Sequence, residues 1–146
     1  MGVFDDKWLT PLAETLKGLG SQKAWVVHGS DGLDEITTTG PTSVAALEDG
    51  KVRRFEVSPE DAKLPIAKPE DLRGGSPEEN AIAMKALLAG DKSAYRDIVV
   101  LNSAAGLIVT GQAENLENGA RMAEQAIDSG KANDALNKLV EISQHS

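Results

Sequence analysis

The segment KAWVVHG at residues 23–29 limits what this chain can fold into more than any other stretch. It is short, apolar at consecutive positions and closed by glycine, which is typical of a strand buried on both faces of a sheet. Strands of that kind usually run parallel to their neighbours and need cover on both sides. We therefore expect an α/β fold in which residues 23–29 form a parallel strand.

Two further elements are predicted around this strand. Residues 5–20 space a tryptophan and several leucines along one face of a helix, with Thr10 as the expected N-cap and Pro11 as the first helical residue. Residues 43–57 predict a β-hairpin in which VAALE and VRRFEV are joined by Asp-Gly at 49–50, a dipeptide that suits a tight turn.

The C-terminal half predicts a helical layer. SPEE at 76–79 is a capping box that opens a helix running to about residue 89. Ser93 can cap the next helix, which continues through DIVVLNSAAGLIVTG; that segment is too long for a strand and apolar all round, so we expect a central buried helix. Two more helices are expected near 116–128 and 132–143.

All 146 residues therefore indicate α/β architecture. Residues 1–57 contain a helix, the buried strand, an acidic loop and the hairpin, residues 58–75 form a loop, and residues 76–146 form the helical layer. A mostly parallel sheet needs more strands than these residues supply. Another copy or chain can complete the sheet, or these residues belong to a larger domain with strands elsewhere; we favour the second interpretation.

Composition narrows the classes of partner. The net charge of −8 and the pI near 4.7 oppose a nucleic-acid partner, because affinity for phosphate backbones comes from clustered Lys and Arg. There is no cysteine, and no apolar run approaches the roughly 18 residues of a membrane span. The N-terminus has no pattern of an export signal. We expect a soluble cytoplasmic protein without a membrane partner.

The segment SDGLDE follows the buried strand directly. In open α/β sheets, ligands bind beyond the carboxyl ends of the strands. Asp34 and Glu35 are adjacent, and such a pair suits Mg²⁺, which keeps several waters and takes one or two carboxylates plus substrate phosphates. Zinc is disfavoured because His28 and His145 are the only histidines and there is no thiolate. The structural alternative is a solvated turn organised by Asp31.

Other candidates have stronger structural interpretations. We interpret His28 as a structural residue and not as an acid or base. The hydroxyls of Thr37, Thr38 and Thr39 can contact phosphates, but threonine runs are ordinary at strand edges. The glycines at 74–75 can bind an anion through backbone amides, but the glutamates of the capping box already occupy that helix end. No catalytic residue is assigned, and substrate-binding residues stay unknown.

Five segments, in this order, resemble the C-terminal portion of anthranilate phosphoribosyltransferase: WVVHGSDGLDEITTTGPTSVAAL, FEVSPEDAKLP, GGSPEENA, RDIVVLNSAAGLIVTG and AIDSGKANDALNKLV. The resemblance extends over residues 2–143, and VVHGxDGLDE is its most specific motif. It implies a nucleoside phosphorylase/phosphoribosyltransferase-like fold and transfer of phosphoribosyl from phosphoribosyl pyrophosphate to anthranilate, with release of pyrophosphate, in tryptophan biosynthesis. It also implies that Mg²⁺ binds the Asp-Glu pair of the motif, hence Asp34 and Glu35.

The family's GTGGD, NxS/T and KHGNR segments, its anthranilate-binding arginine and its helical N-terminal domain, through which members form homodimers, lie upstream of this region and do not occur here. We therefore expect the chain alone to be inactive or nearly so. A non-catalytic metal-binding or interaction module on the same scaffold is the alternative. The related pyrimidine nucleoside phosphorylases share the architecture, but the Asp-Glu motif argues against them.

Overall fold

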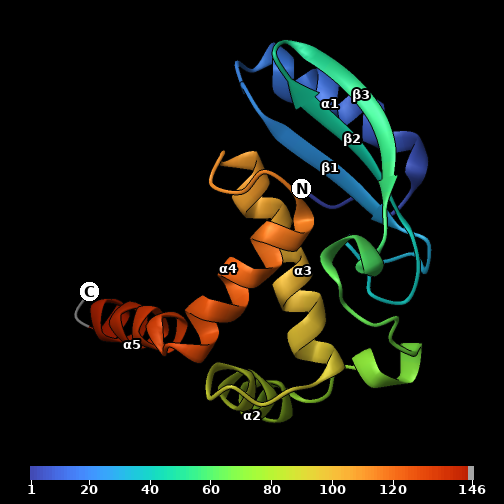
Figure 1. Cartoon of the computed structure of the whole chain (residues 1–146). Coiled ribbons are helices and arrows are strands. Elements are labelled where there is room, and N and C mark those ends of the chain that lie inside the picture. Colours follow the sequence, from blue (N-terminus) through green and yellow to red (C-terminus); the bar gives the residue numbers. More distant parts are fainter. Residues whose placement is uncertain (145–146) are drawn as a thin grey trace.

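A computed structural model describes residues 1–144 of the chain. Its centre is a three-stranded sheet of order β1-β2-β3, with helices on both faces (Figure 1). The α/β class is thereby confirmed, as is the predicted hairpin, whose Asp49 and Gly50 both adopt positive φ angles, 49° and 70°. The strands are β1 (Ala24–Gly29), β2 (Thr42–Glu48) and β3 (Lys51–Val57).

The strands of this sheet pair antiparallel, so the prediction of a mostly parallel sheet was wrong for the strands described here. β1 pairs antiparallel with β2, with Val27 opposite Val44. The connection between them, residues 30–41, contains no helix, and a parallel crossover usually needs one. The hairpin thus supplies the neighbour that β1 requires. A single parallel bridge joins Gly2 to Val27 on the other edge of β1.

β1 is buried on both faces, as predicted. Val26 packs in one cluster with Leu9 and Ala13 of α1 (Leu9–Gly18), which covers one face of the sheet. The next residue, Val27, packs in the second and larger cluster with Val100 and other residues of the C-terminal helices. Alternate side chains of one strand therefore enter two separate cores.

The first helix begins earlier than its sequence suggested. A 3₁₀ turn, η1 (Asp6–Trp8), precedes α1, and the Asp5 carboxylate accepts a hydrogen bond from the Lys7 amide at 3.0 Å. The N-cap prediction for Thr10 was therefore wrong. Pro11 lies in the first turn of α1, where a missing N–H leaves no helical bond unmade.

The four predicted C-terminal helices are confirmed. Their bounds are α2 (Pro77–Leu88), α3 (Ala94–Val109), α4 (Leu116–Asp128) and α5 (Lys131–Gln144), and two 3₁₀ turns, η2 (Pro59–Ala62) and η3 (Pro69–Leu72), interrupt the predicted loop. α3 is central, whereas Lys131–Gln144 contributes no buried residue and lies at the end of the molecule away from the sheet (Figure 1). Within residues 1–144, no helix is long and apolar enough to cross a membrane.

Candidate functional site

The acidic loop, residues 30–41, leaves the end of β1 and returns into β2. Asp34 and Glu35 lie on its exposed part. Within the described chain, neither carboxylate accepts a hydrogen bond or forms an ion pair. The loop therefore presents two adjacent acidic side chains that are not used by the fold.

Asp31 has the opposite role. One of its carboxylate oxygens accepts hydrogen bonds from the hydroxyls of Thr37 at 2.5 Å and Thr39 at 2.7 Å, and the other accepts from the Leu33 amide at 3.1 Å. Burial by itself raises the pKa of Asp31, but these bonds outweigh it and lower the pKa below its ordinary value. Asp31 thus closes the loop from within.

Asn102 of α3 connects the loop to the helical core. Its side-chain oxygen accepts from the Ile36 amide at 3.0 Å, and its side-chain nitrogen donates to the Ile36 carbonyl at 2.8 Å. The same nitrogen donates to the Ile98 carbonyl at 2.9 Å within α3. The Ile36 side chain is buried, with 2% exposed. The residue directly after Glu35 is therefore fixed by both its backbone groups and its side chain.

The N-terminal segment lies against the same loop. The Val3 amide donates to the Val27 carbonyl, and the Val27 amide donates to the Met1 carbonyl, each at 2.9 Å. Between these bonds, Gly2 is so close to the loop that a Cβ atom there would lie 1.4 Å from the Asp34 carbonyl oxygen. Only glycine fits such an approach without moving one of the two backbones.

The donor chemistry of the loop fits magnesium in part. Carboxylate oxygens are suitable ligands, and an exposed pair leaves room for the waters and phosphates with which Mg²⁺ completes its shell. Among residues 1–144, however, no group of three or more acidic or histidine side chains gathers at one point. Asp34 and Glu35 can therefore supply a share of the ligands, and their metal role stays a prediction.

The other candidate residues make contacts within the fold. His28 donates from Nδ1 to the Val3 carbonyl at 2.8 Å. The hydroxyls of Thr37 and Thr39 bind Asp31, while Thr38 is fully buried. The Gly75 amide donates to the Asn80 side chain at 2.9 Å, so it is not available to an anion.

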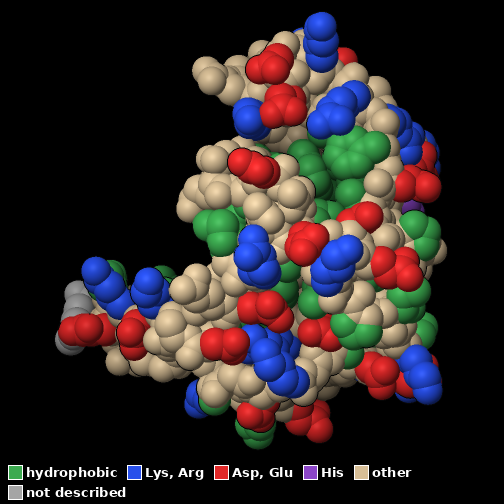
Figure 2. All heavy atoms as spheres, in the orientation of Figure 1, with side chains coloured by type: hydrophobic (Ala, Val, Ile, Leu, Met, Phe, Trp, Pro, Cys, Tyr) green, Lys and Arg blue, Asp and Glu red, His purple; other side chains and the backbone are tan. Residues whose placement is uncertain are grey.

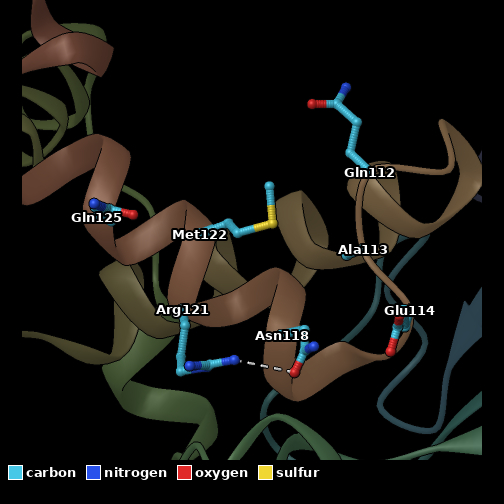
Figure 3. Close-up of a pocket in the computed structure, with 7 residues that line it drawn as sticks. All are labelled: Gln112, Ala113, Glu114, Asn118, Arg121, Met122 and Gln125. Atoms are coloured by element: carbon cyan, nitrogen blue, oxygen red, sulfur yellow. Dashed lines mark hydrogen bonds between the residues drawn. The ribbon is translucent and has the colours of Figure 1, made fainter.

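Two of the hollows near the helices have contrasting linings. A polar one of about 280 Å³ is lined from α4 and the turn before it, where Arg121 donates to Asn118 at 3.2 Å (Figure 3). The other, of about 390 Å³, lies between β1 and α3, and Ile36 and Asn102 are among its lining residues. Figure 2 shows hydrophobic side chains exposed between the sheet and the helices, while acidic and basic side chains are interspersed elsewhere on that face. Neither hollow includes Asp34 or Glu35 in its lining.

Sequence reasoning missed Asn102, because the residue lies 66 positions from Ile36. One signal was available: it is an asparagine between the apolar runs IVVL and AAGLIV of a single helix. Since buried polar groups almost always find partners, such an asparagine indicates a partner on a packed neighbour. The sequence does not say which neighbour.

Comparison with known proteins assigns the scaffold. Residues 1–133 match the model of a glycosyl transferase family, a/b domain. Anthranilate phosphoribosyltransferase from Rhodospirillum rubrum is 61% identical over 142 residues, and that from Parvibaculum lavamentivorans is 60% identical over 140 residues. These alignments cover 97% and 96% of this chain but 41% of each relative. The chain thus spans about two fifths of the length of the curated relatives it matches.

Solved structures agree. Anthranilate phosphoribosyltransferase from Thermus thermophilus superposes with a TM-score of 0.87 at 37% identity, over 96% of this chain and 41% of that one. The enzyme from Saccharomyces cerevisiae in complex with 4-fluoroanthranilate gives a TM-score of 0.87 at 26% identity, over 96% and 41%. A variant of the yeast enzyme with Mg bound superposes with a TM-score of 0.84 at 26% identity, over 93% of this chain and 40% of that one.

Proposed function

Because the chain belongs to this glycosyl transferase family, as part of its a/b domain, we propose that it is the C-terminal portion of an anthranilate phosphoribosyltransferase and provides its Mg²⁺-binding loop. The observation that carries the proposal is the pair Asp34 and Glu35, which are exposed and have no hydrogen-bond or ion-pair partner among residues 1–144. They lie on a loop whose backbone is fixed on either side of them. The complete enzyme would transfer phosphoribosyl from phosphoribosyl pyrophosphate to anthranilate and release pyrophosphate, a step of tryptophan biosynthesis.

Two lines support this reaction class. The relatives from Rhodospirillum rubrum and Parvibaculum lavamentivorans, 61% and 60% identical to this chain, are both named anthranilate phosphoribosyltransferase. The yeast enzyme, at 26% identity, has been solved with an anthranilate analogue and, as a variant, with Mg. The exposed acidic pair is where we propose that a cation binds to this chain.

The chemistry assigned to the chain is electrostatic. Mg²⁺, when bound, would neutralise negative charge that develops on the departing pyrophosphate. Asp34 and Glu35 would bind the ion as carboxylates and need not transfer a proton. Asp31 would keep its bonds to Thr37 and Thr39, so that the loop keeps its shape when the ion binds.

Activity would require the rest of the relatives' length. The test is to assay the chain alone and mixed with the upstream remainder of the Rhodospirillum rubrum relative, following formation of phosphoribosylanthranilate with and without Mg²⁺. We expect little or no turnover from the chain alone and Mg²⁺-dependent turnover from the mixture. The doubly neutralised variant, Asp34→Asn with Glu35→Gln, should abolish that turnover while the mixture still assembles.

The alternative makes a different prediction. A non-catalytic metal-binding or interaction module would bind the cation through the same carboxylates, yet stay inactive in an assembled mixture. For the complete enzyme we also propose a cytoplasmic location and the formation of homodimers. Gel filtration of the chain with and without the upstream remainder tests the second of these.

A further inference from the structure

We infer that Asn102 is a positioning residue for the Asp34–Glu35 pair, acting through the backbone of Ile36; this inference rests on the metal-binding role proposed above. The Ile36 amide nitrogen belongs to the same peptide unit as the Glu35 carbonyl. A hydrogen bond of 3.0 Å from that amide to Asn102 therefore sets the orientation of the peptide that directly follows Glu35. The bond of 2.8 Å to the Ile36 carbonyl fixes the next peptide as well.

The Asn102 side chain is itself well fixed. A primary amide has two N–H donors, and the Asn102 nitrogen donates to the carbonyls of Ile36 and Ile98. Its orientation is therefore set by its own helix as well as by the loop. Next to it in sequence lies Leu101, fully buried in the central cluster. Asn102 thus transmits the position of a packed helix to the acidic pair.

Asp31 does not replace this function. Its bonds reach Leu33, Thr37 and Thr39, all within the acidic loop. They define the internal shape of the loop but not its position relative to α3. A change at Asn102 should therefore leave the loop closed and the Ile36 side chain buried, yet loosen the backbone of residues 34–36.

The chain contains a matched control for this effect. Asn80 makes the same two-bond bracket elsewhere, accepting from the Gly75 amide at 2.9 Å and donating to the Gly75 carbonyl at 3.1 Å. That bracket is exposed and links positions only 5 residues apart. Asn80→Ser and Asn102→Ser each remove a pair of hydrogen bonds between an asparagine side chain and the backbone of one residue. Only the pair made by Asn102 adjoins Asp34 and Glu35.

Serine is the informative replacement at position 102. A helical serine can donate to the carbonyl four residues earlier. The serine side chain in Asn102→Ser can therefore keep a bond to the Ile98 carbonyl, but it is too short to reach Ile36. Asn102→Leu removes all three bonds at nearly constant volume and serves as the more severe variant. If the leucine variant does not fold, the serine variant still tests the inference.

The first measurement uses the metal-free chain of 146 residues. In Asn102→Ser we expect the ¹⁵N order parameters of Asp34, Glu35 and Ile36 to fall from about 0.85 to below about 0.6, with those of Thr37 to Thr39 unchanged. Asn80→Ser should leave all of them at wild-type values. Wild-type order at residues 34–36 in a folded Asn102→Ser chain would overturn the inference, whatever the metal affinity.

The second measurement is a titration with Mn²⁺ as a stand-in for Mg²⁺, followed by paramagnetic broadening of the same amides. Loss of a residue that orients metal ligands weakens binding about 10–100-fold, so we expect at least a tenfold rise in Kd for Asn102→Ser and less than a twofold rise for Asn80→Ser. Broadening that survives Asp34→Asn with Glu35→Gln would count against the proposed metal role alone. An unchanged Kd in Asn102→Ser, with broadening lost in the neutralised pair, would count against the inference alone.

Discussion

The acidic loop and the segment from residue 58 to residue 75 are both irregular connections, but their side-chain hydrogen bonds differ in reach. In the acidic loop, Asp31 organises the turn, and Asn102 and Gly2 fix it from distant parts of the chain. In the second connection, Asp61 accepts from the Ser58 amide at 2.7 Å and Asp71 accepts from the Lys68 amide at 3.4 Å, each across 3 residues. A backbone bond of 2.8 Å from the Ala67 amide to the Thr38 carbonyl joins this connection to the acidic loop.

The difference explains what each connection can do. Side-chain bonds across 3 residues define a turn but do not place it against a packed helix. Long-range bonds, such as those of Asn102 across 66 residues, place a loop against a packed helix. A site that must present two carboxylates in a constant geometry needs bonds of both kinds. The acidic loop has both, and four predictions test that contrast.

The largest effect is expected at Gly2. A Cβ at this position would lie 1.4 Å from the Asp34 carbonyl oxygen, so Gly2→Ala must displace either the N-terminal segment or the loop. Overpacking of this kind costs about 3 kcal/mol of unfolding free energy, measurable by urea denaturation. Gly74→Ala is the control, since its Cβ would meet the Asn80 side chain at an ordinary 3.6 Å. Equal stabilities of the two variants would contradict the close approach.

Asp31→Ala should have the next largest effect. It removes an ionised acceptor of three hydrogen bonds and leaves the Thr37 hydroxyl and the Leu33 amide without that partner. We expect a loss of about 2 kcal/mol at neutral pH, the range of hydrogen bonds to charged groups. Asp71→Ala removes one exposed, long bond and should cost less than about 0.5 kcal/mol. Thermal or urea unfolding of both variants would decide whether the two connections differ as described.

Two adjacent buried threonines provide a finer comparison. Thr37 donates to Asp31, whereas the Thr38 hydroxyl is buried without a hydrogen-bond partner among the described residues. Thr37→Val should therefore cost about 1 kcal/mol, and Thr38→Val should be neutral or slightly stabilising, because no bond is lost with its hydroxyl. If Thr38→Val were the more damaging of the two, the bonding pattern of this loop would be wrong.

The smallest expected effect is on the pH dependence of stability. The folded-state pKa of Asp31 is lowered, so its contribution is complete above the unfolded value of about 4 and is lost as pH falls through the folded value. Burial raises the pKa of Asp97 in α3, so its contribution has the opposite sign: it is complete below about pH 4 and is lost as pH rises.

Midpoints of urea unfolding at neutral pH and near pH 3 measure how the contributions of Asp31 and Asp97 to stability change with pH. Between these conditions, Asp31→Ala should lose less stability than wild type as pH falls, because the contribution that acid removes is already absent. Asp97→Asn should lose more, because the compensating gain is absent. Identical slopes in the two variants would show that neither carboxylate contributes as its surroundings indicate.

Much of the molecule was predictable from neighbouring residues. The structure confirms the predicted capping box at Ser76, the Asp49-Gly50 turn, the strand within residues 23–29 and the helix at 116–128. Each depends on side chains and backbone groups within three or four positions of one another, or on the repeat of apolar residues along one face. The position of the acidic pair in the loop that follows β1 was predictable for the same reason.

Local sequence patterns predict most of the helices and strands, the burial of β1 and the two carboxylates in the loop after it. Long-range packing determines that β1 pairs antiparallel with β2, that Gly2 packs on Asp34, and that Asn102 binds Ile36. The physical reason is distance along the chain. A turn or cap forms from adjacent residues, whereas a strand's partner and an asparagine's partner depend on which surfaces meet when the two cores pack.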